Sequence, residues 1–168
     1  KTPVIFISGH FSNFELMAME IEKSGVNLSA IYRPLNNIFL NLLMERIRKK
    51  YICKNQIKKG TSGVRELLRL YKKGCSIALM IDQRVSQGIK SKFFDEEAFT
   101  TTIPAQFIKK FNCKVVPISI ERHNDINFNI KIEKPMEFSK NSSTEKITRE
   151  LNIWLEKTIL KNPGQWIW

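Results

Sequence analysis

His10 and Glu15 are the residues whose types and spacing could do chemistry. They lie between an apolar run at residues 4–7, typical of a buried strand, and a helix-like pattern that begins at Leu16. Loops at strand ends commonly present catalytic groups. An imidazole with a carboxylate on its far nitrogen is a general base with an orienting group. Because we identify no Ser or Cys nucleophile beside the pair, we expect the substrate's own hydroxyl to attack.

A structural role for both residues stays open at this point. A lone His near a helix start is usually structural, and a Glu in a first helical turn commonly serves the helix dipole. Other parts of the sequence are therefore needed to choose between a catalytic and a structural role for the two residues.

The chain carries a large excess of positive charge. Its 168 residues include 28 Lys and Arg against 16 Asp and Glu, a formal net charge of +12. This imbalance indicates an anionic partner: nucleic acid, an acidic protein, or a membrane surface with phosphorylated lipid. The alternative is a solvated surface, because pairs such as Lys49-Lys50 and Lys72-Lys73 lie at expected helix ends, where they favour the helix dipole.

The cysteines and histidines predict neither a metal site nor a disulfide framework. Cys53, Cys75 and Cys113 are isolated, and His10 and His123 are the only histidines of the sequence. We therefore expect no metal and no cofactor. The sequence also has no run of 18 apolar residues, so none of it is expected to span a membrane.

Strand and helix patterns alternate along the chain, which predicts a single α/β domain with a mostly parallel central sheet flanked by helices. The expected strands are residues 4–8, 26–32, 76–81, 115–120 and 128–132, the last one antiparallel. The expected helices are residues 13–23, 38–50, 64–71, 103–111 and 142–161. Residues 85–102 show no clear period and are expected to form a long functional or mobile loop.

Six blocks of the sequence, in this order, resemble the lysophospholipid-type acyltransferases, and most closely the lauroyl or myristoyl acyltransferases of lipid A biosynthesis in Gram-negative bacteria. The resemblance covers essentially the whole chain. The blocks are His10 with Glu15; Tyr32-Arg33-Pro34; residues 63–68 with Asp82-Gln83-Arg84; Gly88-Ile89 with Phe93-Phe94; Val115-Val116-Pro117; and Pro163-Gly164-Gln165-Trp166.

The chain departs from the pattern of these relatives in two respects. Asp95 stands where relatives often carry Gly after the paired Phe. The chain also opens without Met and stops before the expected basic-aromatic tail. We therefore expect residues 1–168 to be an incomplete acyltransferase domain that lacks an N-terminal membrane helix and a C-terminal tail.

The resemblance implies a glycerolipid-acyltransferase-like fold. It also implies transfer of a fatty acyl chain from acyl carrier protein to a hydroxyl of a lipid A precursor of the Kdo-lipid IVA type. The catalytic residues are then His10, as general base, and Glu15, which orients the imidazole. Because such acceptors carry phosphates, Arg33, Arg84 and Arg65 are the expected substrate-binding residues; for each, a merely solvated surface position is the alternative.

The remaining implications concern partners and location. Acyl carrier protein is acidic, so it would give the basic surface a purpose. A membrane surface is the other expected partner, at the cytoplasmic face of the bacterial inner membrane. Phe93, Phe94, Phe99 and Phe107 are candidate walls of an acyl channel, although such aromatics are more often ordinary core. Asp82 is expected to be structural, as a local cap.

Two other functions stay open. The same His and acid pair would serve a glycerolipid acyltransferase that acts on lysophosphatidic acid, although that branch usually carries a different block where Asp82-Gln83-Arg84 stands. A basic nucleic-acid-binding module is conceivable from the pI of about 9.8. We expect no nucleic-acid partner, because the sequence shows no recognised nucleic-acid-binding signature.

Overall fold

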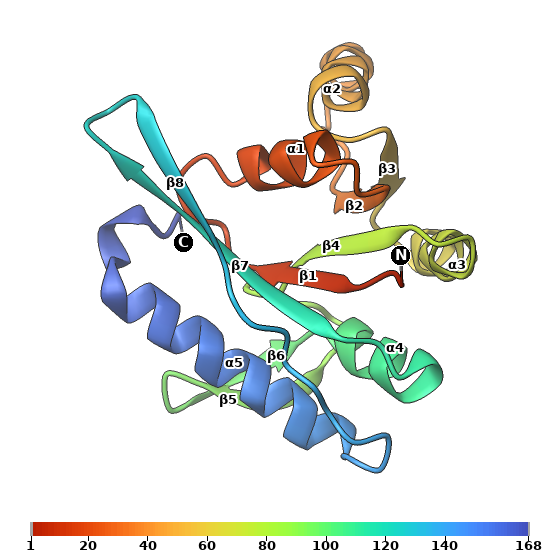
Figure 1. Ribbon diagram of the computed structural model, residues 1–168, viewed down its shortest axis with the longest axis vertical. Coiled ribbons are helices and arrows are strands. Elements are labelled where there is room, and N and C mark those ends of the chain that lie inside the picture. The colour runs from red at the N-terminus through yellow and green to blue at the C-terminus, as the bar shows by residue number, and fades with distance from the viewer. Residues whose placement is uncertain (1, 168) are drawn as a thin grey trace. The chain divides into compact units, whose positions relative to one another are not determined.

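A computed structural model describes residues 2–167 (Figure 1). The strands are β1 (Ile5–Ser8), β2 (Leu28–Tyr32), β3 (Asn55–Lys58), β4 (Ser76–Met80), β5 (Ile89–Phe93), β6 (Glu96–Thr100), β7 (Val115–His123) and β8 (Asn127–Ile132). The helices are α1 (Glu15–Lys23), α2 (Ile38–Tyr51), α3 (Thr61–Lys72), α4 (Ile103–Phe111) and α5 (Thr144–Lys161), followed by a 3-10 turn, η1 (Pro163–Gln165).

The strands form a six-stranded sheet in the order β3-β2-β4-β1-β7-β8 and a separate two-stranded sheet, β5-β6. Strand β2 pairs in parallel with both β3 and β4, whereas β8 pairs antiparallel with β7. This arrangement confirms the predicted α/β class with a mostly parallel sheet flanked by helices.

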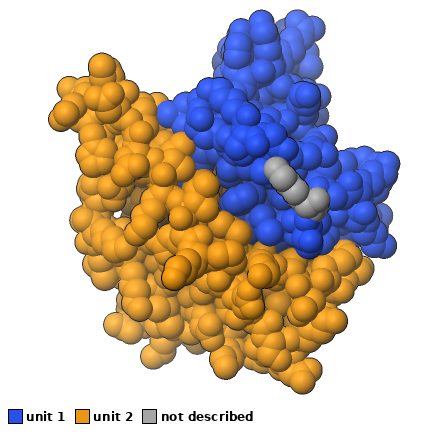
Figure 2. Space-filling model, in the orientation of Figure 1, with its two compact units in different colours: residues 1–6, 15–79 blue, residues 7–14, 80–168 orange. Residues whose placement is uncertain are grey.

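The chain divides into two compact units (Figure 2). Unit 1 runs up to residue 6 and again over residues 15–79, and unit 2 takes residues 7–14 and everything from residue 80 onward. The elements α1, β2, α2, β3 and α3 belong wholly to unit 1, and β5 to β8, α4 and α5 belong wholly to unit 2. Unit 2 therefore joins two segments that are distant in the sequence.

In unit 1, α3 packs closely against β3. Leu67 and Tyr71 are buried on one face of α3, at helical spacing. Gly63, near the start of that helix, leaves no room for a side chain, because a Cβ there would lie 2.1 Å from the Lys58 carbonyl oxygen. The absent side chain is what lets the first turn of α3 approach the end of β3.

In unit 2, β7 and two helices provide most of the core. Residues 115–120 of β7 are all buried, as expected for a strand covered on both faces. Helix α5, which Figure 1 shows alongside β5, buries Ile147, Leu151 and Leu155 at spacings of four residues. Ser143 caps α5 by accepting a hydrogen bond from the Lys146 amide, close to the predicted start of this helix at residue 142.

The prediction of a long loop over residues 85–102 is wrong, because the β5-β6 hairpin occupies most of it. Asn152, buried on α5, holds this hairpin by donating hydrogen bonds to the Ser91 hydroxyl, the Lys92 carbonyl and the Thr100 hydroxyl. These contacts come from a residue more than 50 positions away, so no local pattern reveals them. Strand β3 was also not predicted, since its four residues carry a single Ile among polar neighbours.

Among residues 2–167, no helix has both the length and the apolar composition needed to cross a bilayer.

Candidate active site

His10 lies two residues after the end of β1, and its imidazole contacts the carboxylate of Asp82, which lies two residues after the end of β4. His10 Nδ1 lies 2.7 Å from Asp82 Oδ1, and the backbone N–H of His10 donates to Asp82 Oδ2 at 2.6 Å. Both residues lie in unit 2. The two contacts fix the ring and its backbone to one carboxylate, so the direction of the imidazole is set by a residue 72 positions along the chain.

The Asp82 carboxylate is fully buried and accepts a third hydrogen bond, from the indole N–H of Trp166 at 3.0 Å. Burial by itself would raise the pKa of Asp82, but the hydrogen bonds from His10 and Trp166 outweigh it and hold that pKa below its ordinary value. The carboxylate is therefore charged at neutral pH. A charged carboxylate only accepts hydrogen bonds, so His10 Nδ1 carries the proton. Nε2, which lies 3.5 Å from the side-chain amide nitrogen of Gln83, is then the ring nitrogen that can accept a proton.

Gly9 makes room for this pair. A Cβ at Gly9 would lie 2.9 Å from a methyl group of Leu155, 3.0 Å from the Phe11 ring and 3.1 Å from Asp82 Oδ2. These distances are shorter than normal carbon contacts, so any side chain at this position would push against the carboxylate or the core. Packing around Asp82 therefore requires glycine at position 9, directly before His10.

The segment around η1 closes over the His10 loop from the other end of the chain. The Ser12 amide donates to the Gln165 carbonyl, the Ile167 amide donates to the His10 carbonyl, and Phe11 and Trp166 form an antiparallel bridge. This short pairing places the Trp166 indole against Asp82. The block at residues 163–166 therefore positions the Trp166 indole beside Asp82 in unit 2.

The Gln165 side chain anchors the same segment to β7. It accepts a hydrogen bond from the Arg122 amide at 2.7 Å and donates to the Arg122 carbonyl at 2.9 Å. Arg122 in turn donates to the Asn13 side chain. These contacts connect the His10 loop, the end of β7 and the 165–167 segment.

Glu15 begins α1, in unit 1, and forms an ion pair with Arg48 on α2, with 2.8 Å between Oε1 and Nε. The Arg48 guanidinium also lies 5.6 Å from the centre of the Tyr32 ring. The position at His10 Nδ1 that we expected Glu15 to occupy is held by Asp82. A catalytic role for Glu15 stays a prediction.

The three predicted phosphate-binding arginines are all solvent-exposed. Arg33 follows β2 and Arg65 lies in α3, both in unit 1, whereas Arg84 follows Asp82 in unit 2. The Arg84 guanidinium lies 5.7 Å from the centre of the Phe99 ring. Exposure leaves all three guanidinium groups accessible to an anionic ligand, and their role stays a prediction.

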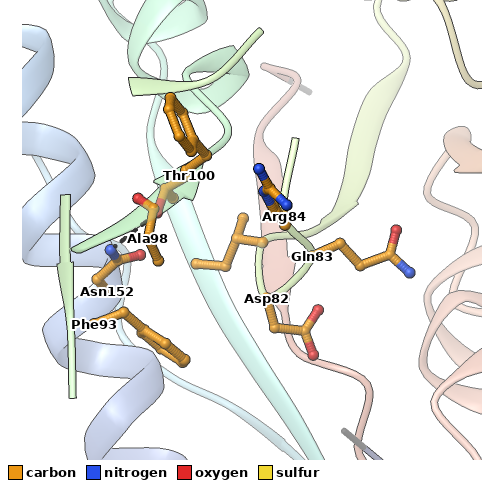
Figure 3. Close-up of a pocket in the computed structure, with 9 residues that line it drawn as sticks. Asp82, Gln83, Arg84, Phe93, Ala98, Thr100 and Asn152 are labelled. Atoms are coloured by element: carbon orange, nitrogen blue, oxygen red, sulfur yellow. Dashed lines mark hydrogen bonds between the residues drawn. The ribbon is translucent and has the colours of Figure 1, made fainter. Parts of the chain in front are cut away.

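A small pocket lies beside the His10 and Asp82 pair in unit 2. Figure 3 shows Asp82, Gln83 and Arg84 on one wall and Phe93, Ala98, Thr100 and Asn152 on the other. Phe93 and Phe99 line this pocket, as two of the four predicted aromatic walls. Phe107 instead lies in the core against Phe111, and Phe94 stacks edge-on against Phe93.

The chain matches the family model for bacterial lipid A biosynthesis acyltransferase over residues 1–168. The chain is a member of that family. The resemblance expected from the six sequence blocks is thereby confirmed, and the protein is an acyltransferase of bacterial lipid A biosynthesis. No curated protein gives a significant match to the chain.

In this lipid A acyltransferase, the contacts of Asp82 with His10 and Trp166 differ from those expected from the sequence. Asp82 was expected to be a local cap, and the structure instead places it on the imidazole of His10. Two signals were available, because Asp82 follows a buried strand in the same way as His10 and lies in a family block. For Trp166 the only signal was its position in the block at residues 163–166, since no local pattern indicates that its indole reaches Asp82.

Proposed function

We propose that this protein transfers a fatty acyl chain from acyl carrier protein to a hydroxyl of a lipid A precursor of the Kdo-lipid IVA type. The reaction would take place at the cytoplasmic face of the inner membrane, with the protein attached peripherally or through an N-terminal helix. The observation that carries the proposal is the contact between His10 and buried, charged Asp82 in a chain of this family.

His10 would act as the general base through Nε2. As the acceptor hydroxyl oxygen attacks the thioester carbonyl carbon, Nε2 takes its proton, and the new C–O bond gives a tetrahedral intermediate. The C–S bond then breaks, and the leaving thiolate takes the proton back from the imidazolium. A well-placed base of this kind contributes ~10²–10⁴-fold in rate.

Asp82 would stabilise the imidazolium that forms on His10 during the attack. Its negative charge lies on the Nδ1 side, so it favours the doubly protonated ring without competing for the proton that Nε2 accepts. Because the carboxylate is buried and already held by two N–H donors besides Nδ1, it needs no reorganisation when the charge appears.

Glu15 is the second catalytic residue of the proposal. The ion pair with Arg48 fixes the direction of its carboxylate. Its effect on His10 would be electrostatic, as an additional negative charge that favours the imidazolium. Removal of each carboxylate in turn separates this role from that of Asp82.

The exposed basic residues would serve the two partners. Arg33, Arg65 and Arg84 are the proposed contacts for acceptor phosphates, since a guanidinium binds a phosphate through two parallel N–H bonds. The net charge of +12 would steer the acidic acyl carrier protein toward the enzyme. Both effects weaken at high salt, as interactions between exposed charges do.

The test is an acyl-transfer assay with acyl carrier protein as donor and a tetra-acylated, Kdo-bearing lipid A precursor as acceptor. The wild type is expected to transfer, and His10→Ala to lose transfer while it keeps its circular dichroism spectrum. A folded His10→Ala protein that retains most of its activity would overturn the role of the base. Transfer to lysophosphatidic acid, and not to the lipid A precursor, would overturn the acceptor.

A further inference from the structure

Helix α2 presents three polar side chains inward and most of its large apolar side chains outward. The residues with the lowest exposure on α2 include Asn41, which is buried, and Glu45 and Arg48, which are half-buried. They recur at spacings of four and three residues and therefore share one face of the helix. A helix on a globular protein normally shows the opposite arrangement, with the apolar face inward.

Specific contacts hold the polar face of α2 against unit 1. Asn41 accepts a hydrogen bond from the Leu35 amide and donates one to Glu45. Glu45 also accepts one from the Tyr32 hydroxyl and pairs with Lys58. The hydrogen bond from Tyr32, with that from Asn41, lowers the pKa of Glu45 to about 2, so the carboxylate stays charged. This network fixes the rotation of the helix about its axis.

The outward face of α2 is broadly apolar. Phe39 is 84% exposed and Ile38 74%, and the other large apolar side chains of this face are each more than a third exposed. The side chains concerned are Ile38, Phe39, Leu40, Leu42, Leu43 and Ile47. Contiguous exposed apolar groups on this scale mark a surface that something covers.

The charges on α2 indicate what that occupant is. Arg46, Lys49 and Lys50 are exposed beside the apolar side chains, whereas the single acidic residue of the helix, Glu45, faces inward. The outward face therefore combines apolar groups with positive charge alone. That combination is typical of helices that lie in the headgroup region of an anionic bilayer, with apolar groups below the phosphates and cations among them.

We propose that α2 is a membrane-docking helix, which lies in the plane of an anionic lipid surface with Phe39 and Leu43 inserted. Its 14 residues extend about 21 Å at 1.5 Å per residue, which is too short to cross the ~30 Å hydrocarbon core. A second copy of the chain fits this face less well, because two such faces would bring like charges together.

The inward network supports this orientation of the helix. Asn41, Glu45 and Arg48 tie α2 to Tyr32 and to Glu15 through hydrogen bonds and an ion pair. Met44 is half-buried on this side of the helix, whereas Phe39 and Leu43 are exposed. Replacement of the exposed pair is therefore expected to leave the attachment of α2 intact.

The first experiment is flotation of the protein with vesicles of phosphatidylethanolamine and phosphatidylglycerol. Phe39→Asp and Leu43→Asp are compared with Leu160→Asp, which removes a similarly exposed apolar side chain (68%) from α5. Each α2 variant should lower vesicle binding by ~10-fold or more, from the lost burial of one large apolar side chain. The α5 variant should bind like the wild type.

Folding of the variants is checked by circular dichroism and thermal unfolding. Phe39→Asp is expected to fold, because an acidic residue in the first turn of a helix favours its dipole. Lys49→Gln with Lys50→Gln should reduce binding to the anionic vesicles and leave the weaker binding to pure phosphatidylcholine vesicles unchanged. Equal binding of the wild type and a well-folded Phe39→Asp variant would overturn the proposal.

A second readout reports the depth of the helix. Because Cys53, Cys75 and Cys113 are buried, an environment-sensitive fluorophore can be attached to Phe39→Cys, with Leu160→Cys as the matched control. Brominated lipids should quench the label on α2 and not the label on α5. Equal quenching of both, or a Phe39→Asp variant that turns a dimer into a monomer without change in vesicle binding, would overturn the assignment to lipid.

The inference goes beyond the proposed acyl transfer, since neither readout requires catalysis. A protein that binds vesicles through α2 and fails to acylate a lipid A precursor would keep the docking helix and lose the proposed function. A protein that acylates the precursor without binding vesicles through α2 would keep the proposed function and lose the docking helix.

Discussion

Trp166 donates its indole N–H to Asp82 Oδ2, the oxygen that also accepts the backbone N–H of His10. One carboxylate oxygen thus receives donors from the first loop of the chain and from its last described segment. The other oxygen faces His10 Nδ1. Because Trp166 donates to Asp82, we regard it as a positioning residue, whose effect reaches the reaction through the charge and direction of Asp82.

Replacement of the two carboxylates should separate their roles. Asp82→Asn removes the charge at Nδ1 and offers that nitrogen an amide, so we expect kcat to fall ~10²–10⁴-fold, the range of general-base catalysis. Glu15→Gln should have a smaller effect, because Glu15 is paired with Arg48. Steady-state kinetics of both variants with one acceptor measure the difference. A greater loss in Glu15→Gln than in Asp82→Asn would reassign the orienting group.

Trp166→Phe should change the pH dependence of the reaction. The ring is retained but the N–H donor is lost, so the pKa of Asp82, now held low partly by Trp166, should rise. In the proposed mechanism the charged carboxylate is the active form, so the acidic limb of the kcat profile should move to higher pH, with kcat near neutral pH reduced less. A uniform loss at all pH values would mean that Trp166 only supports the fold.

The same pKa shift makes a prediction about stability. The pKa of Asp82 is lower in the folded protein than in the unfolded chain, so its ionised contacts stabilise the fold above the unfolded value, ~3.9. That stabilisation is lost as the pH falls through the folded pKa. The difference in free energy of unfolding between wild type and Asp82→Asn, from urea titrations, should therefore shrink as the pH is lowered from 7 to 3. A constant difference would contradict the assignment.

Gly9→Ala should damage both activity and stability. The added Cβ would lie within 3.1 Å of Leu155, Phe11 and Asp82, and relief of such overpacking typically costs about 1–3 kcal/mol. Gly164→Ala is a suitable control, since a Cβ there meets no atom within 4 Å. Thermal unfolding and kcat of the two variants make the comparison. Equal behaviour of the two would show that the His10 loop adapts to the added group.

How far the sequence predicts this protein depends on how local each signal is. Strands such as β4 and helices such as α5 were predicted because their apolar period lies within the element itself. The β5-β6 hairpin was missed because Asn152, far along the chain, holds it. The helix over residues 38–50 was predicted from its apolar spacing, but that spacing does not say which way the apolar face points.

In the candidate site too, the features with a local signal were predicted and the contacts between distant residues were not. His10 was found because its type, its strand-end position and its block are local properties. Its partner was assigned to Glu15, the nearest carboxylate in sequence, whereas the structure places Asp82 on Nδ1. The carboxyl ends of adjacent strands in a sheet bring distant residues together, so proximity along the chain is a poor guide to the orienting group.

Asp95→Gly should stabilise the protein slightly. Phe94 and Asp95 form the two-residue turn between β5 and β6, and both have positive φ, 50° and 64°. This geometry matches a type I′ hairpin turn, which favours Gly at its second central position. A left-handed conformation costs an ordinary residue ~1–2 kcal/mol, and Asp less. Gly relieves this strain but is more flexible in the unfolded chain, which offsets part of the gain. We therefore expect the free energy of unfolding to rise by about 0.5 kcal/mol.

Thermal unfolding of Asp95→Gly beside Glu96→Gly tests this account of the turn. Glu96 is exposed and lies in β6, directly after the turn, where Gly weakens a strand. The two variants should therefore shift the midpoint in opposite directions, Asp95→Gly upward and Glu96→Gly downward. A fall of similar size in both would show that the Asp95 side chain supports the hairpin.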